Sequence, residues 1–242
     1  MRVSATVISA ALMVASAGLV GAQGSDSSDI AFYAKEDGAA AGRIADYVQT
    51  VRLAPKEPDI RPNRDVKEQA NSELTQIIAY YDAAIRHDPQ DDDAYFHRGI
   101  ANFYAGDRSQ ALVDLGKASK LDPKYPYYPL WIDIIDRRAN AASNLPQAIA
   151  NLDMTKWPAP VIRLFLGETT PADVLAAADD PDANTKQGQI CEANFYSGEL
   201  ALQQGAEDQA ARLFTLAAAG CPRSFVEGPA ASSELEALGG KR

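Results

Sequence analysis

The stretch "DDAYFHRGIANFYAGDRSQALVDLGKASKLDP", residues 92–123, decides the fold of this chain. Gly99 and Ala111 are small at the two places where a pair of antiparallel helices would cross closely. Gly106 turns the chain between these helices, and Pro123 ends the second one because proline cannot continue a helix. The stretch therefore predicts a helix-turn-helix unit.

Six residues of this stretch fit the frame of the tetratricopeptide repeat, so it resembles that unit of about 34 residues. Counted from Asp92 as position 1, they occupy positions 4, 8, 20, 24, 27 and 32: Tyr95, Gly99, Ala111, Leu115, Ala118 and Pro123. A second window, counted from Cys191, fills positions 8, 15, 20, 24, 27 and 32: Gly198, Gly205, Ala210, Phe214, Ala217 and Pro222. The resemblance implies an all-α fold, a tetratricopeptide-repeat helical solenoid.

Composition and periodicity divide the rest of the chain. Residues 63–228 form the predicted solenoid, with helical periodicity over 64–87 and shorter, proline-initiated helices between the two repeats. Residues 23–62 are expected to be a flexible leader with a short helix, since prolines interrupt its second half. Residues 229–242 are rich in Ala and Gly, and we expect a C-terminal tail there.

Residues 1–22 predict a secretory signal peptide. They carry one charge, Arg2, followed by an uncharged apolar run that ends at the small residue Ala22. The alternative is an uncleaved membrane anchor, although the run is barely long enough to span a bilayer. Gln23 stands where a lipid-anchor cysteine would follow, so no lipid anchor is expected and the mature protein should be periplasmic or secreted.

The chain is acidic, with 23 Lys and Arg against 33 Asp and Glu and a net charge of −10. Removal of the signal peptide takes away only Arg2, which makes the balance more negative still. No basic stripe is present. Binding to nucleic acid or to an anionic membrane surface is therefore disfavoured.

The chain has two cysteines, Cys191 and Cys221, at frame positions 1 and 31 of the second repeat. In an antiparallel helix pair both positions lie at the same open end, so a disulfide could meet the required Cα spacing of about 4.4–6.8 Å. Two reduced, half-buried thiols are the alternative.

Known catalytic motifs are absent: there is no Gly-x-Ser-x-Gly, no Walker-type loop and no His-Glu-x-x-His. His97 lies beside the small-residue seam, where a packed surface histidine is the plain alternative to a catalytic one. The segment "DDPDAN", 179–184, spaces Asp180, Asp182 and Asn184 like the start of a calcium loop, but the turn glycine and the glutamate at position 12 are missing. The sequence predicts no catalytic residue, no metal and no cofactor.

A binding surface remains as the candidate site. In the repeat family, frame positions 2, 5, 9, 12 and 13 of the first helix face the concave side, and here they are Asp93, Phe96, Ile100, Phe103 and Tyr104. Such an apolar patch could anchor apolar side chains of a protein or peptide partner. Alternatively, the N-terminal helix or a tail of the chain covers it. The two-lysine, two-asparagine carboxylate clamp of chaperone-binding repeats is missing.

Between Asp92 and Glu227 the chain is also similar to the NlpI-like lipoproteins of Gram-negative bacteria. The most specific sequence motifs of this similarity are Trp157–Pro158, Phe165–Leu166–Gly167 and Asn194–Phe195–Tyr196. The resemblance implies a periplasmic adaptor that forms homodimers and brings cell-wall hydrolases and a tail-specific protease together. The chain departs from the family in lacking the lipid-anchor cysteine and in having fewer N-terminal repeats.

The resulting hypothesis is a non-enzymatic interaction scaffold that acts in envelope proteolysis or peptidoglycan turnover. Two alternatives stay open. One is an enzyme, or an accessory subunit of one, whose site lies outside known motifs. The other is a purely self-assembling structural repeat protein.

Overall fold

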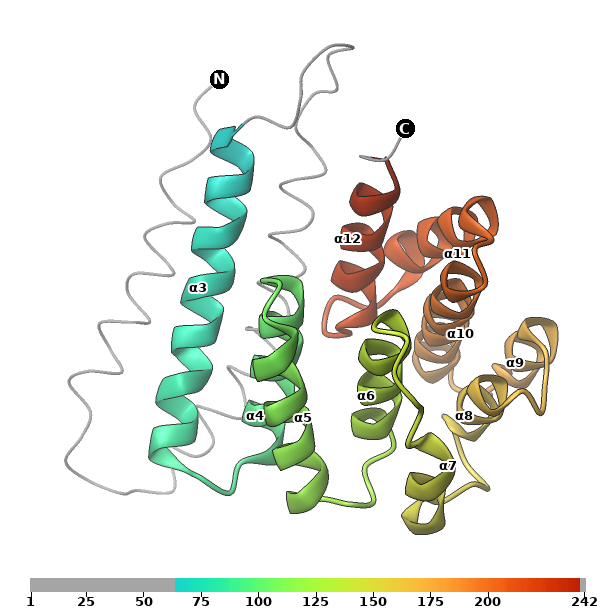
Figure 1. The fold of residues 1–242 in the computed structure, drawn as a ribbon. Coiled ribbons are helices and arrows are strands. Elements are labelled where there is room, and N and C mark those ends of the chain that lie inside the picture. The colour runs from blue at the N-terminus through green and yellow to red at the C-terminus, as the bar shows by residue number, and fades with distance from the viewer. Residues whose placement is uncertain (1–63, 240–242) are drawn as a thin grey trace. The chain divides into compact units, whose positions relative to one another are not determined.

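The computed structural model describes residues 64–239, and every regular element in this range is helical (Figure 1). This confirms the all-α prediction for the described range. The predicted signal peptide and leader, and the end of the tail, lie outside it. The elements, in order, are α3 Arg64–His87, α4 Asp92–Tyr104, α5 Arg108–Leu121, α6 Tyr127–Arg138, α7 Leu145–Ala148, η1 Ile149–Asn151, α8 Ala159–Leu166, α9 Pro171–Ala177, α10 Ala183–Gln203, α11 Glu207–Gly220 and α12 Glu227–Gly239.

Helices α4 and α5 form the first hairpin, the unit predicted from residues 92–123. Asp107 caps α5 by accepting a hydrogen bond from the backbone N–H of Gln110 at 2.9 Å. The turn before it needs Gly106, whose φ of 89° other residues rarely adopt. A Cβ on Gly99 would lie 3.0 Å from Cγ of Leu115, so the small residue is what lets the two helices approach.

Helices α10 and α11 form the second hairpin on the same plan. Gly205 turns the chain with a φ of 75°. A Cβ on Gly198 would lie 2.7 Å from the Phe214 ring. The first helix is longer than the repeat frame predicts, because Asp182 caps α10 by accepting from the backbone N–H of Thr185. Cys191 therefore lies inside α10 rather than at its start.

The short helices between the hairpins begin near prolines, as predicted. Pro126 precedes α6, and prolines occupy the first turns of α7, α8 and α9. Gly167 ends α8 in the left-handed conformation, with a φ of 75°. Trp131 of α6 and Phe165 of α8 belong to one continuous apolar core that runs from α4 to α12.

The prediction of a C-terminal tail at 229–242 is corrected for its described part, because residues 227–239 form helix α12. Alanine and leucine favour helix, and Pro229 lies in the first turn, where proline is tolerated. Most of α12 is buried: Glu227, Gly228, Pro229, Ala230, Ala231, Ser232, Glu234 and Leu238. The Ala- and Gly-rich composition that indicated a tail belongs instead to a packed helix.

Candidate functional site

The five residues predicted to bind a partner lie on α4 or at its start, but they do not form an open apolar patch. Phe96 and Ile100 are only 4% and 2% exposed and belong to the core. Phe103 and Tyr104 are half-buried against the same core, and Asp93 is partly exposed. The ring of Phe96 packs against Tyr125 and Tyr128 beside it. Partner binding by these residues stays a prediction.

Helix α12 packs against α11 and α10, its Glu234 pairs with Arg138 at the end of α6, and the charge of Glu234 also acts on Tyr104 of α4. We name this surface the α12 seat and define it by five residues: Tyr104, Arg138, Glu192, Tyr196 and Glu199. Glu234 and Glu227 are the residues through which α12 meets it, by an ion pair and a hydrogen bond respectively.

Arg138 holds one half of the α12 seat together. Its guanidinium pairs with Glu199 of α10 at 2.6 Å and with Glu234 of α12 at 2.7 Å. Burial raises the pKa of Glu199 to about 7, although the Arg138 charge acts in the opposite direction. The charge of Arg138 also lies over the Phe103 ring, 5.3 Å from its centre. One cation thus serves two carboxylates in a buried site.

Glu192 lies in the other half, without a cation. Its Oε2 accepts hydrogen bonds from the Tyr127 hydroxyl and from Nε1 of Trp157, each at 2.7 Å. Burial, together with the negative charge of Glu227, raises the pKa of Glu192 to about 8. The seat therefore favours a protonated carboxyl at this position.

Glu227 of α12 faces the same half. It accepts a hydrogen bond from the Tyr196 hydroxyl at 2.9 Å. Burial raises the pKa of Glu227, while that hydrogen bond and the nearby His97 act to lower it. Two buried carboxyls, Glu192 and Glu227, thus repel each other electrostatically, and hydroxyl and indole groups donate hydrogen bonds to them. Chemically, this arrangement can hold a proton or receive a cation.

These four glutamates were not among the predicted site residues, although their spacing carried a signal. Glu192 and Glu199 are seven residues apart, and so are Glu227 and Glu234. Seven residues are two helical turns, so each pair shares one helix face. Charged residues on a face that packs inward are uncommon unless they are paired.

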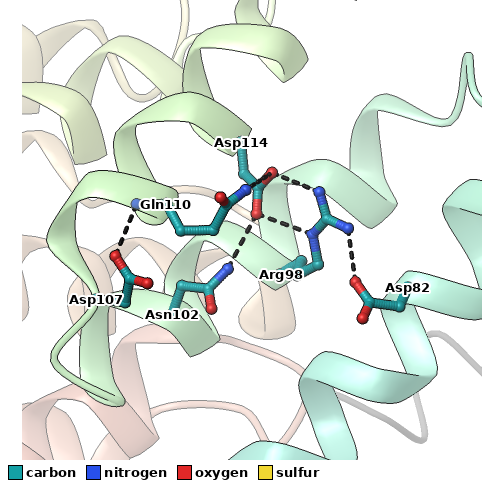
Figure 2. A network of polar contacts seen from close by, with 6 residues as sticks. All are labelled: Asp82, Arg98, Asn102, Asp107, Gln110 and Asp114. Atoms are coloured by element: carbon teal, nitrogen blue, oxygen red, sulfur yellow. Dashed lines mark hydrogen bonds and ion pairs between the residues drawn. The ribbon is translucent and has the colours of Figure 1, made fainter.

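A second polar network lies between α3, α4 and α5 (Figure 2). Arg98 of α4 donates to Asp82 of α3 at 2.7 Å and to both carboxylate oxygens of Asp114 of α5. Asn102 and Gln110 also donate to Asp114, which is fully buried. Through Arg98 and Asp114, the network ties α3, α4 and α5 together.

The cysteine prediction is confirmed. Cys191 and Cys221 form a disulfide whose Cα atoms are 4.7 Å apart. It joins the middle of α10 to the end of α11 and so fastens the second hairpin.

The remaining candidates from the sequence have local structural roles. His97 is buried, stacks on Tyr81 at 5.4 Å and lies 3.5 Å from an Asp93 oxygen. Asp182 of the predicted calcium-like segment caps α10, and Asp180 accepts from the Asp182 backbone N–H. Within residues 64–239, no group of three or more His, Cys, Asp or Glu could hold a metal ion.

A pocket of about 260 Å³ opens beside Trp157. Its two basic residues are already engaged: Lys156 pairs with Asp153, and Arg163 donates to the backbone oxygen of Met154. None of the described helices has the length and hydropathy needed to cross a membrane. A comparison with models of known protein families finds none that matches this chain.

Proposed function

We propose that this protein is a non-enzymatic scaffold of the tetratricopeptide type. It binds other proteins through the α12 seat and through its rim, by which we mean the partly exposed side chain of Tyr125. The observation that carries the proposal is that the seat already holds a helix, α12, by a buried ion pair and a hydrogen bond. A surface with an aromatic floor and fixed charges that accommodates one helix suits a helical segment of another protein.

The assignment to the tetratricopeptide type is supported by the two hairpins. In each, a glycine of the first helix meets a large side chain of the second: Gly99 meets Leu115, and Gly198 meets Phe214. These pairs occupy positions 8 and 24 of the same frame. The resemblance to NlpI-like adaptors extends the proposal to a periplasmic role in envelope proteolysis or peptidoglycan turnover. A disulfide is typical of such an oxidising compartment.

Tyr125 offers the way to test partner binding. It lies on the rim beside Phe96 and Tyr128 and is 36% exposed. A photoreactive p-benzoylphenylalanine placed at Tyr125 should give discrete adducts with other proteins in an envelope extract, identifiable by mass spectrometry. The same group placed at Leu216, which is 57% exposed, is the control. Adducts no more abundant from Tyr125 than from Leu216 would contradict the proposal.

An enzyme is the second candidate, and the pair of carboxyls Glu192 and Glu227 favours it. A carboxyl with a raised pKa can act as a general acid near neutral pH. Both side chains are nearly inaccessible to substrate, which is why we place this function second. Hydrolase activity in the purified protein that disappears in Glu192→Gln and Glu227→Gln would reverse the order.

A further inference from the structure

Helix α12 matches one half of the α12 seat in charge and not the other. At Arg138 the match is good, because Glu234 brings a negative charge to a guanidinium at 2.7 Å. At Glu192 the match is poor, because Glu227 is hydrogen-bonded to Tyr196, one helical turn along α10 from Glu192, and so brings a second carboxyl toward the first. The two positions are seven residues apart on α12 and therefore face the seat together.

The surroundings of Glu192 strengthen the mismatch. Tyr127, Trp157 and Tyr196 supply neutral donors to this half of the seat. Asp92 and Asp93 at the start of α4 add negative charge nearby, and the charges of both act on Tyr125. His97 is the basic group that acts on Glu227. This half of the seat would therefore accept a positive charge better than the carboxyl it now holds.

Helix α12 also has few large apolar side chains to hold it. Its buried residues are mostly alanine, serine, glycine and glutamate, with Leu238 and the half-buried Leu235 as its larger apolar contacts. A buried leucine contributes more to packing than a buried alanine, because it removes more apolar surface from water. A partner helix with larger apolar residues could compete for the same floor.

We propose that α12 is an internal stand-in for a partner helix that carries a lysine or arginine at the position of Glu227 and an acidic residue seven positions later. In the complex the basic residue pairs with Glu192 and the acidic residue replaces Glu234 at Arg138. The inference rests on the proposed function and adds the charge order of the partner and the displacement of α12.

Three synthetic peptides test the charge order on the full-length chain. All are 18-residue amphipathic helices of leucine and alanine, and they differ only at two positions seven residues apart: Lys then Glu, Glu then Lys, or Glu then Glu. The first two have the same composition and net charge, so attraction to an acidic protein cannot separate them. By fluorescence anisotropy, the Lys-then-Glu peptide should bind at least about tenfold more tightly than either of the others.

Two variants locate the effect. Glu192→Gln removes the partner of the lysine without removing its hydrogen-bond acceptor, and it should abolish the preference between the first two peptides. Glu236→Gln, on the exposed side of α12, is the matched control and should leave the preference unchanged. Equal effects of the two substitutions would overturn the placement at Glu192.

Hydrogen exchange reports the displacement. With the Lys-then-Glu peptide bound, backbone amides of residues 227–239 should exchange faster, while those of α5 should not. Unchanged exchange in α12, or equal affinity for all three peptides, would overturn the inference. Tightest binding of the Glu-then-Glu peptide would do so too, because it would point to α12 of a second copy. The Tyr125 adducts do not depend on charge order, so they would survive such a failure.

Discussion

At the scale of single residues, Asp114 is the most constrained charge in the described chain. It is fully buried between α4 and α5 and receives hydrogen bonds from Arg98, Asn102 and Gln110 (Figure 2). A buried carboxylate with this many donors is stable as long as all of them remain, because removing its cation leaves an uncompensated charge. Arg98 is therefore the residue on which the junction of α3, α4 and α5 depends.

Replacing Arg98 with alanine should lower the free energy of unfolding by about 3–5 kcal/mol. Chemical denaturation monitored by circular dichroism gives the value. Lys186→Ala is the control, because it breaks an exposed ion pair with Asp179 and should leave the denaturation midpoint nearly unchanged. Equal midpoints for the two variants would show that the buried network contributes nothing.

The second residue-scale prediction concerns pH. The pKa of Glu192 is about 8 in the folded protein and about 4.5 in the unfolded chain, so between these values the folded state binds more protons. Stability should therefore fall as the pH rises from about 5 to 8, by up to about 1.4 kcal/mol per pH unit for one such group.

Glu192→Gln should make this slope shallower, because glutamine does not titrate, whereas Glu199 and Glu227, whose pKa values burial also raises, still contribute. Glu168→Gln, at an exposed position, is the control and should keep the slope of the parent protein. Thermal melting at pH 5, 6, 7 and 8 measures it. A slope that is identical in both variants would place the pH dependence elsewhere in the molecule.

At the scale of elements, each hairpin depends on how closely its two helices approach. In the second hairpin the Phe214 ring occupies the space that a Cβ on Gly198 would need. In the first hairpin, helix α5 contains Gly116, and a Cβ added there would meet no neighbouring atom. These two positions allow the effect of crowding to be separated from the effect of helix propensity.

Gly198→Ala should destabilise the protein by about 1–3 kcal/mol, since the ring or the backbone must move to admit the methyl group. Gly116→Ala should stabilise it by about 0.5–1 kcal/mol, because alanine is the better helix former and meets no neighbour. Differential scanning calorimetry should show melting temperatures that shift in opposite directions. Shifts of the same sign would mean that crowding by Phe214 does not restrict position 198 to glycine.

The elements also show what sequence can and cannot predict here. The hairpins were predictable because glycine, alanine and proline at fixed spacing report on local helix crossing, and the same spacing placed Cys191 beside Cys221. The contacts of α12 with Arg138 and Tyr196 were not, because they join segments far apart in the chain. Periodicity marks Phe96 and Ile100 as inward-facing but does not distinguish a groove from a core.

At the scale of the whole molecule, the disulfide acts mainly through the unfolded chain. Cys191 and Cys221 are 30 residues apart in sequence, so their bond closes a loop of that length and lowers the conformational entropy of the unfolded chain. The continuous core from α4 to α12 means that this effect should be felt by all of these helices together.

The double variant Cys191→Ala, Cys221→Ala should lose about 3–4 kcal/mol of stability, on the chain-entropy account of a loop of this length. Guanidinium denaturation measures the loss. Reductant should destabilise the parent protein and leave the double variant unchanged. Two reactive thiols in the unreduced, unfolded parent protein would refute the bond itself.

The position of α12 after all the other helices also orders the events of biosynthesis. Because α6 and α10 leave the ribosome first, Arg138 and Tyr196 must wait for residues 227–239 before Glu234 and Glu227 reach them. A chain cut short before Glu227 would keep these side chains uncovered and would present them to chaperones and proteases.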